Sequence, residues 1–217
     1  MNLNKYLDTF FPNLKLQKPL FYNWKNGLRF EIGLESMPTM NDYEKNIVNL
    51  EYFEKALERA VQLFEYAFHT NDEVIIVCQR YSKNRQKIKK NSLFINAIND
   101  LKLKDIESFK LRNLYIEDGY DTKQEHWHRI AIHLNTNDVN YKTILKRLTY
   151  FDFGASGPEV YFINKTKNII FNLYDDRGLD IISTDKKNLE NIYQTFNSWI
   201  LDYDRKQIDA LFHEQGL

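Results

Sequence analysis

Residues 169–182 read IIFNLYDDRGLDII, two runs of strand-forming residues on either side of an acidic turn. The flanking segments 169–174 and 179–182 are rich in Ile, Phe, Leu and Tyr, which favour a pleated sheet. Aspartate favours the early positions of a turn, and glycine supplies the positive φ that a tight hairpin needs. The stretch therefore predicts two adjacent strands, with Gly178 in the left-handed region at the tip.

Further strands are expected upstream of this hairpin. Residues 28–33 read LRFEIG and alternate between apolar and charged side chains, which places Leu28, Phe30 and Ile32 on one buried face. Residues 73–78 form an apolar run without alternation, as expected for a central strand covered on both faces. Strand character is also found at residues 111–116, 128–134 and 160–163.

Helical spacing of apolar residues recurs between the strands. The strongest stripe, within residues 42–69, repeats every 3.6 residues and predicts the principal helix, with its core at 50–68. Pro12 ends a short helix that begins near Leu3. Asp204, with Gln207 three residues later, resembles an N-cap pair for a last helix over 205–212. Helical spacing is also present at residues 94–101, 138–148 and 189–200.

These elements occur in clusters and lack regular βαβ alternation, which indicates an α+β fold. We expect one mostly antiparallel sheet of about six or seven strands packed against helices, with a C-terminal helical pair. A chain of 217 residues with 43% hydrophobic content can bury one substantial core. Residues 1–217 are therefore predicted to form a single α+β domain.

Charge and cysteine usage limit the choice of partner and compartment. Thirty basic and thirty acidic side chains cancel, so no global field attracts nucleic acid or anionic lipid, and neither is an expected partner. Cys78, the only cysteine, lies in an apolar run and is expected to be a buried thiol. Without a signal-peptide core or an apolar run of membrane-spanning length, the chain is expected to be cytoplasmic.

The acidic turn, defined as Asp175, Asp176 and Arg177, has two interpretations. Turn formation alone accounts for its composition. Alternatively, two carboxylates and a guanidinium could bind a divalent ion, a phosphate or a basic partner. A metal-dependent hydrolase or nuclease would use these three residues together with His128, and Arg177 would stabilise developing negative charge.

Other catalytic patterns are missing from the sequence. His126 and His128 share one face of a strand, but a zinc site needs more ligands than the sequence offers at suitable spacing. Neither a Ser-His-Asp nor a Cys-His set is suggested, and no phosphate-binding or dinucleotide motif is present. We therefore predict no metal and no cofactor, and favour a non-enzymatic role.

Two charged surfaces are the candidates for binding. The basic segment, residues 80–90, has six basic and no acidic residues: Arg80, Lys83, Arg85, Lys87, Lys89 and Lys90. The C-terminal cluster consists of Trp199, Asp202, Asp204 and Arg205. The first could be a solvated surface and the second a helix cap with an ion pair. Concentrated charge beside aromatic residues also suits a protein interface, and our leading hypothesis is a protein-binding domain, of the immunity or antitoxin-like kind.

Three strings together resemble a known bacterial family: LRFEIG at 28–33, IIFNLYDDRGLDII at 169–182 and YQTFNSWILDYDRKQID at 193–209. The chain resembles the family named domain of unknown function 3885, from about Leu20 to Phe212. The resemblance implies a stand-alone bacterial intracellular domain and brings no activity with it. The positions that carry it are Arg29, Glu31, Asp175, Asp176, Arg177, Asp180, Trp199, Asp202, Asp204 and Arg205.

Overall fold

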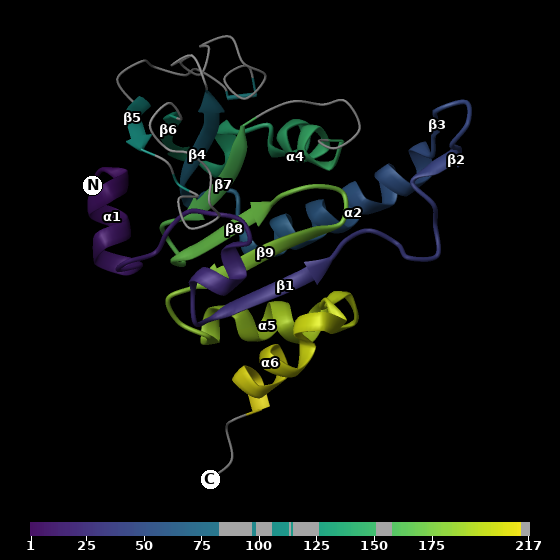
Figure 1. Ribbon diagram of the computed structural model, residues 1–217. Helices are drawn as coiled ribbons and strands as arrows, with labels where there is room; N and C mark the ends of the chain where they lie inside the picture. Colours follow the sequence, from purple (N-terminus) through teal and green to yellow (C-terminus); the bar gives the residue numbers. More distant parts are fainter. Residues whose placement is uncertain (83–96, 99–105, 113, 115–125, 151–157, 214–217) are drawn as a thin grey trace.

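A computed structural model describes residues 1–82, 97–98, 106–112, 114, 126–150 and 158–213 (Figure 1). Within these residues seven strands form one sheet in the order β1-β9-β8-β7-β4-β6-β5, and every neighbouring pair is antiparallel. The strands are β1 (Gly27–Glu31), β4 (Glu73–Ser82), β5 (Ile106–Arg112), β6 (His126–Asn135), β7 (Glu159–Asn164), β8 (Ile169–Leu173) and β9 (Gly178–Ser183). The α+β fold with a largely antiparallel sheet is thus confirmed.

Helices cover both faces of the sheet. One face packs against α2 (Leu50–Ala67), α4 (Tyr141–Thr149) and α5 (Lys187–Thr195). The other face is covered by α1 (Leu3–Phe10) and the short 3-10 helix η1 (Leu20–Asn23). Two further 3-10 helices are η4 (Thr136–Asp138) and η5 (Asn197–Trp199). The last helix, α6 (Asp202–His213), forms the expected C-terminal pair with α5 and packs beside β1 (Figure 1).

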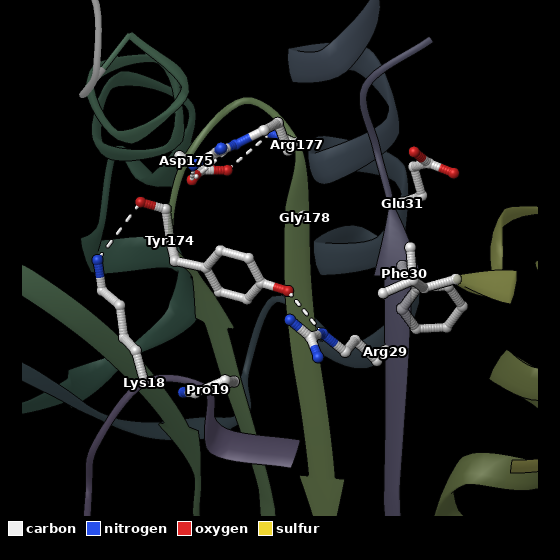
Figure 2. Close-up of a pocket in the computed structure, with 10 residues that line it drawn as sticks. Lys18, Pro19, Arg29, Phe30, Glu31, Tyr174, Asp175, Arg177 and Gly178 are labelled. Atoms are coloured by element: carbon white, nitrogen blue, oxygen red, sulfur yellow. Dashed lines mark hydrogen bonds and ion pairs between the residues drawn. The ribbon is translucent and has the colours of Figure 1, made fainter. Parts of the chain in front are cut away.

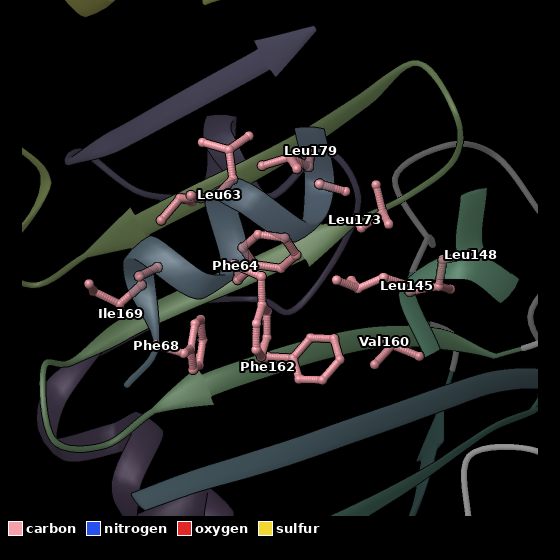
Figure 3. Close-up of a cluster of buried hydrophobic side chains, with 14 of the residues drawn as sticks. Leu63, Phe64, Phe68, Leu145, Leu148, Val160, Phe162, Ile169, Leu173 and Leu179 are labelled. Carbon is pink, nitrogen blue, oxygen red and sulfur yellow. The ribbon is translucent and has the colours of Figure 1, made fainter. Parts of the chain in front are cut away.

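The larger core lies between α2 and the sheet. The ring of Phe64 on α2 meets Phe162 of β7 edge to face, with centroids 5.0 Å apart, and stacks on Phe68 at 4.4 Å (Figure 3). Such ring pairs contribute about 0.5–1.5 kcal/mol beyond the area they bury. The helical stripe in the sequence therefore corresponds to the face of α2 that packs on the sheet.

The central strand behaves as its apolar run predicts. Ile76 and Cys78 of β4 face the α2 core, whereas Ile75 and Val77 face the α1 core. Cys78 is fully buried, and this burial raises the pKa of its thiol to about 12. The expected buried thiol is confirmed.

The alternation in β1 is also confirmed, because Leu28, Phe30 and Ile32 are all 0% exposed. β1 is an edge strand that pairs only with β9 in the sheet. Its outer side is partly closed by the segment before α6, where the Leu201 amide donates to the Arg29 carbonyl at 3.0 Å. This contact places the start of α6 beside the first strand.

Other boundaries differ from the sequence predictions. The strand expected at 111–116 is β5, which begins at Ile106 because its pairing with β6 extends back to Ile132; residues 113 and 115–125 lie outside the described part. In the segment 94–101, Ile98 forms an isolated bridge with Val139, and residues 94–96 and 99–101 are outside the described part. The principal helix begins only at Leu50, where the Asn49 side chain caps it.

Residues before that helix form the short hairpin β2 (Met40–Asp42) and β3 (Ile47–Val48). Asn46 at its turn has a φ of 53°, a conformation that asparagine tolerates better than most residues. Within the part of the chain that the structure describes, no helix is both long enough and apolar enough to cross a bilayer.

Candidate functional site

A pocket of about 490 Å³ opens where β1 ends and the β8–β9 turn begins (Figure 2). The Lys18-Pro19 segment closes another side, and Leu201 contributes from the start of α6. We call it the Tyr174 pocket, because the Tyr174 ring lies in the middle of the residues drawn in Figure 2. Its charged lining residues are Lys18, Arg29, Glu31, Asp175 and Arg177.

Arg29 connects four elements around this pocket. Its Nε donates to the Tyr174 hydroxyl at 3.1 Å, and its Nη1 donates to the Tyr22 hydroxyl at 2.8 Å. The same Nη1 donates to Asp204 Oδ2 of α6 at 3.1 Å. Because the partners come from η1, from the end of β8 and from α6, Arg29 fixes these elements to β1.

Asp180 of β9 lies beneath this network and is 0% exposed. Its Oδ2 accepts the Phe21 amide at 3.0 Å, and its Oδ1 lies 3.6 Å from Arg29 Nε. Burial raises the pKa of Asp180 to about 6, even though the Phe21 amide and the Arg29 charge favour the carboxylate. The Tyr174 hydroxyl, 3.4 Å from Oδ1, completes its surroundings.

The acidic turn is held by contacts of both of its carboxylates. Asp175 Oδ1 accepts the Arg177 amide at 2.8 Å, and Asp175 Oδ2 accepts Arg177 Nε at 3.1 Å. Asp176 is 2% exposed and accepts the Tyr52 hydroxyl at 2.9 Å. Burial raises the pKa of Asp176, with the nearby Asp175 charge adding to the rise. Asp175 therefore stabilises the turn itself, and Asp176 attaches the turn to α2.

The prediction for Gly178 is wrong. Its φ lies outside the left-handed region, and Gly178 is the first residue of β9, paired with Glu31. A Cβ at this position would lie 2.7 Å from the Tyr174 hydroxyl and 3.1 Å from the Phe30 carbonyl oxygen. Glycine is thus required by the close approach of the Tyr174 ring, and the turn does not need it for its φ.

His128 does not join the acidic turn. It lies on β6, paired with Arg80 of β4, and both β4 and β7 separate β6 from β8. Three strand spacings place it roughly 14 Å from β8. Over the described ranges, no group of three His, Cys, Asp or Glu side chains is arranged to hold a metal ion.

The C-terminal cluster lies at the start of α6, next to the pocket. Arg205 Nε donates to Asp202 at 2.9 Å, as the ion-pair interpretation expects. The cap prediction is wrong, because α6 begins at Asp202 and not at Arg205. The buried Asp204 lies inside the first turn of α6 and bonds to Tyr22 and Arg29.

Trp199 lies apart from those contacts. It packs on the α2 side of the sheet, with its ring 5.0 Å from the Arg59 guanidinium. Of the basic segment, Arg80 is exposed at the end of β4, and Lys83, Arg85, Lys87, Lys89 and Lys90 lie outside the described residues.

Two exposed tyrosines complete the corner beside the pocket. Tyr22 is 51% exposed and Tyr203 is 86% exposed. The Tyr22 hydroxyl donates to Asp204, the residue after Tyr203, at 2.8 Å. Burial and this hydrogen bond raise the pKa of Tyr22, and the nearby Tyr203 phenol adds to the rise. Sequence patterns do not single out Lys18 or Tyr22, because their contacts with Tyr174 and Asp204 join segments that are far apart in the chain.

The chain matches one protein family over most of its length. The family described as Domain of unknown function (DUF3885) matches residues 3–204, which include every residue that lines the pocket. The Bacillus subtilis (strain 168) protein named Uncharacterized protein YnaE is 25% identical over 217 residues, covering 94% of this chain and 99% of that protein. No solved structure matches the chain.

Proposed function

Because the chain belongs to the DUF3885 family, whose description assigns no activity, we propose its function from the site: it is a non-enzymatic domain that binds a protein partner. We call the binding surface the Tyr22–Tyr203 surface. It consists of Tyr22, Tyr203, Asp202 and Arg205, beside the Tyr174 pocket. More specifically, we propose that the domain masks its partner, as an immunity or antitoxin-like protein does.

The exposure of Tyr22 and Tyr203 next to the Arg29 network carries this proposal. Tyrosine and arginine are enriched at the energetic centres of protein interfaces, because they combine large contact area with polar ends. The anchored hydroxyl of Tyr22 fixes its ring before a partner arrives. Less conformational entropy is then lost on binding.

The engagement of the carboxylates supports a non-enzymatic role. Asp175 is bound by Arg177, Asp176 by Tyr52, and Asp204 by Tyr22 and Arg29. A hydrolase that used the acidic turn would have to break these contacts before a metal ion could bind. The distance of His128 from the turn points in the same direction.

The basic segment is the second part of the proposal. Its six cations would accelerate encounter with an acidic partner surface by electrostatic steering. We place this function in the cytoplasm, since the single cysteine is a buried free thiol and leaves no disulfide to form within the chain.

The proposal is tested by affinity capture from the native host, followed by binding measurements with the captured protein. Tyr203→Ala is expected to weaken binding at least about tenfold, because an exposed anchor is lost without a change in the core. Tyr43→Ala is the matched control: Tyr43 is 69% exposed but belongs to the turn between β2 and β3. Equal affinity of the wild type and both variants would contradict the proposed surface.

The charge component has its own test. Reversal of Lys87, Lys89 and Lys90 to Glu is expected to slow association with the partner and to leave the folded state intact. If the isolated protein instead binds DNA or RNA tightly and salt-sensitively, and the triple variant loses that binding, the protein partner is the wrong class.

A further inference from the structure

We propose that Asp180 and Asn172 form a proton-dependent switch beneath the Tyr22–Tyr203 surface. In its neutral state Asp180 donates its O–H to the Asn172 side-chain oxygen, and loss of this proton draws the Arg29 guanidinium away from the surface toward Asp180. The effect on a partner rests on the proposed function. The shared proton does not, and it can be measured in the isolated chain.

The Asn172 side chain supplies a buried acceptor. It is 0% exposed, and its Nδ2 donates to the Val160 carbonyl oxygen at 2.8 Å. This bond fixes which amide atom is the oxygen, because an oxygen in the place of Nδ2 would face a second acceptor. Among the described residues no donor reaches Asn172 Oδ1, and a buried acceptor without a donor destabilises a fold.

Asp180 is the side chain placed to supply a donor. It lies directly across from Asn172 in the antiparallel pairing of β8 with β9. Side chains at such paired positions lie on the same face of a sheet, with Cβ atoms about 4.5–5.5 Å apart. β8 lies between β7, which carries Val160, and β9. Because Nδ2 is bonded on the β7 side, the oxygen of the same amide group is directed away from β7, the side on which Asp180 lies.

Burial favours the neutral form of Asp180. The carboxyl is 0% exposed, and this burial is the largest contribution to its raised pKa of about 6. The other groups that contact it are the amides of Leu20 and Phe21, the Arg29 guanidinium and the Tyr174 hydroxyl. Each of these lowers the pKa, but together they do not offset the burial. A neutral carboxyl has one O–H to donate and therefore needs an acceptor.

Arg29 transmits the charge of Asp180 to the surface. Its Nε lies 3.6 Å from Asp180 Oδ1, and its Nη1 donates to the Tyr22 hydroxyl at 2.8 Å and to Asp204 Oδ2 at 3.1 Å. With Asp180 neutral, the attraction of the guanidinium to Asp204 is unopposed by it. With Asp180 charged, two carboxylates compete for one cation, and the contacts with Tyr22 and Asp204 weaken.

The direction of the pH effect follows from these contacts. Tyr22 is held most firmly while Asp180 is neutral, so affinity for a partner is expected to be highest below about pH 6 and to fall as the pH rises through that value. Linkage makes the effect reciprocal: a partner that binds the ordered Tyr22 raises the pKa of Asp180.

The shared proton is tested by carbon-13 NMR titration of the Asp180 carboxyl in the whole chain. Asn172→Leu keeps the size of the side chain but removes the acceptor, and it is expected to lower the midpoint by about half to one pH unit. Tyr174→Phe is the control: it removes a hydroxyl 3.4 Å from Asp180 that favours the carboxylate, and it should raise the midpoint.

The wild type provides a second measurement that needs no variant. The Asn172 side-chain carbonyl carbon should shift with the same midpoint as the Asp180 carboxyl. An Asn172 signal that does not titrate, or a midpoint left unchanged by Asn172→Leu, would exclude the pair. A fall caused by Tyr174→Phe would assign the proton to the phenol and would equally exclude it.

The link to the surface is tested on the Tyr22 ring. Its NMR signals should titrate with the Asp180 midpoint in the wild type and not in Asp180→Asn, which keeps a neutral donor for Asn172; those of the exposed Tyr43 should titrate in neither. With the captured partner, the wild type should bind about fivefold or more tightly at pH 5 than at pH 7, relative to the same ratio for Asp180→Asn. Equal ratios, or a Tyr22 titration that persists in Asp180→Asn, would refute the switch. A titrating Tyr22 in a chain that binds no partner would support the switch and contradict the proposed function alone.

Discussion

Gly178 shows how one missing side chain permits the central contact of the site. We expect Gly178→Ala to lower the free energy of unfolding by about 1–3 kcal/mol, because its Cβ would lie 2.7 Å from the Tyr174 hydroxyl. Urea denaturation of the wild type, of Gly178→Ala, of Tyr174→Phe and of the double variant measures the effect. The alanine should cost less when the hydroxyl is absent. An equal cost in both backgrounds would place the strain elsewhere.

Asp180 predicts an unusual pH dependence. Its pKa rises from 3.8 to about 6 on folding, so between these values the folded state binds a proton that the unfolded chain releases. Stability from this group is therefore fully present below about pH 4 and is lost as the pH rises through about 6, by up to about 3 kcal/mol.

The measurement compares the wild type with Asp180→Asn. All other titratable groups are present in both proteins, so their contributions cancel in the difference between the two unfolding free energies. The difference in unfolding free energy, wild type minus variant, should fall as the pH is raised from 4 to 7. Carbon-13 NMR of the Asp180 carboxyl should give a midpoint near 6. A midpoint at or below the ordinary value would refute the explanation by burial.

At the scale of elements, the guanidinium of Arg205 attaches α6 to the segment that precedes it. Arg205 donates to the Asn197 side chain at 3.2 Å and to the carbonyls of Asn197 and Ile200 at 3.1 and 3.0 Å. A lysine ammonium cannot reach all three acceptors. We expect Arg205→Lys to cost about 1–2 kcal/mol of thermal or urea stability.

Asp202→Asn is the control for that change. It removes the other partner of Arg205, but the Asp202 side chain is 93% exposed, and exposed pairs contribute at most about 1 kcal/mol. The two variants should differ clearly. Equal losses would mean that the ion pair, and not the carbonyl contacts, holds the start of α6.

Local patterns predicted the elements well where burial of one face or of both faces determines the spacing of apolar residues. The alternation of Leu28, Phe30 and Ile32 and the uniform run 73–78 each depend only on which faces meet a core. The start of β5 could not be predicted in this way, because pairing with β6 determines it. Asp204 was misassigned for a similar reason: its partners, Arg29 and Tyr22, lie about 180 residues earlier.

At the scale of the whole molecule, we expect no response to divalent metals. Added Mg²⁺, Mn²⁺ or Zn²⁺ should leave the melting temperature unchanged, because no group of three potential metal ligands is found among the described residues. An ion that bound only the folded state would raise it. Differential scanning fluorimetry with and without each ion provides the measurement. A reproducible rise that Asp176→Asn abolishes would instead favour the hydrolase or nuclease alternative.

The candidate site also shows where sequence reasoning stops. The acidic turn and the C-terminal cluster stand out by composition, but nothing local indicates that Arg29 joins the second of them to Tyr174. Composition likewise cannot show that Asp175 and Asp176 are held by Arg177 and Tyr52. The acidic turn and the C-terminal cluster could be named from the sequence, whereas Lys18, Tyr22 and the grouping of these residues required the fold.

The pairing of β1 with β9 has a consequence for synthesis. Gly27 pairs with Ile182, so the first strand of the sheet meets its neighbour only after roughly 150 further residues have been made. At about 5–20 residues per second, Leu28 and Phe30 leave the ribosome on the order of ten seconds or more before β9 exists. During that interval the nascent chain presents an apolar segment that a chaperone can hold. The ion pair between Arg29 and Asp204 forms later still, because Asp204 is synthesised after the last strand of the sheet.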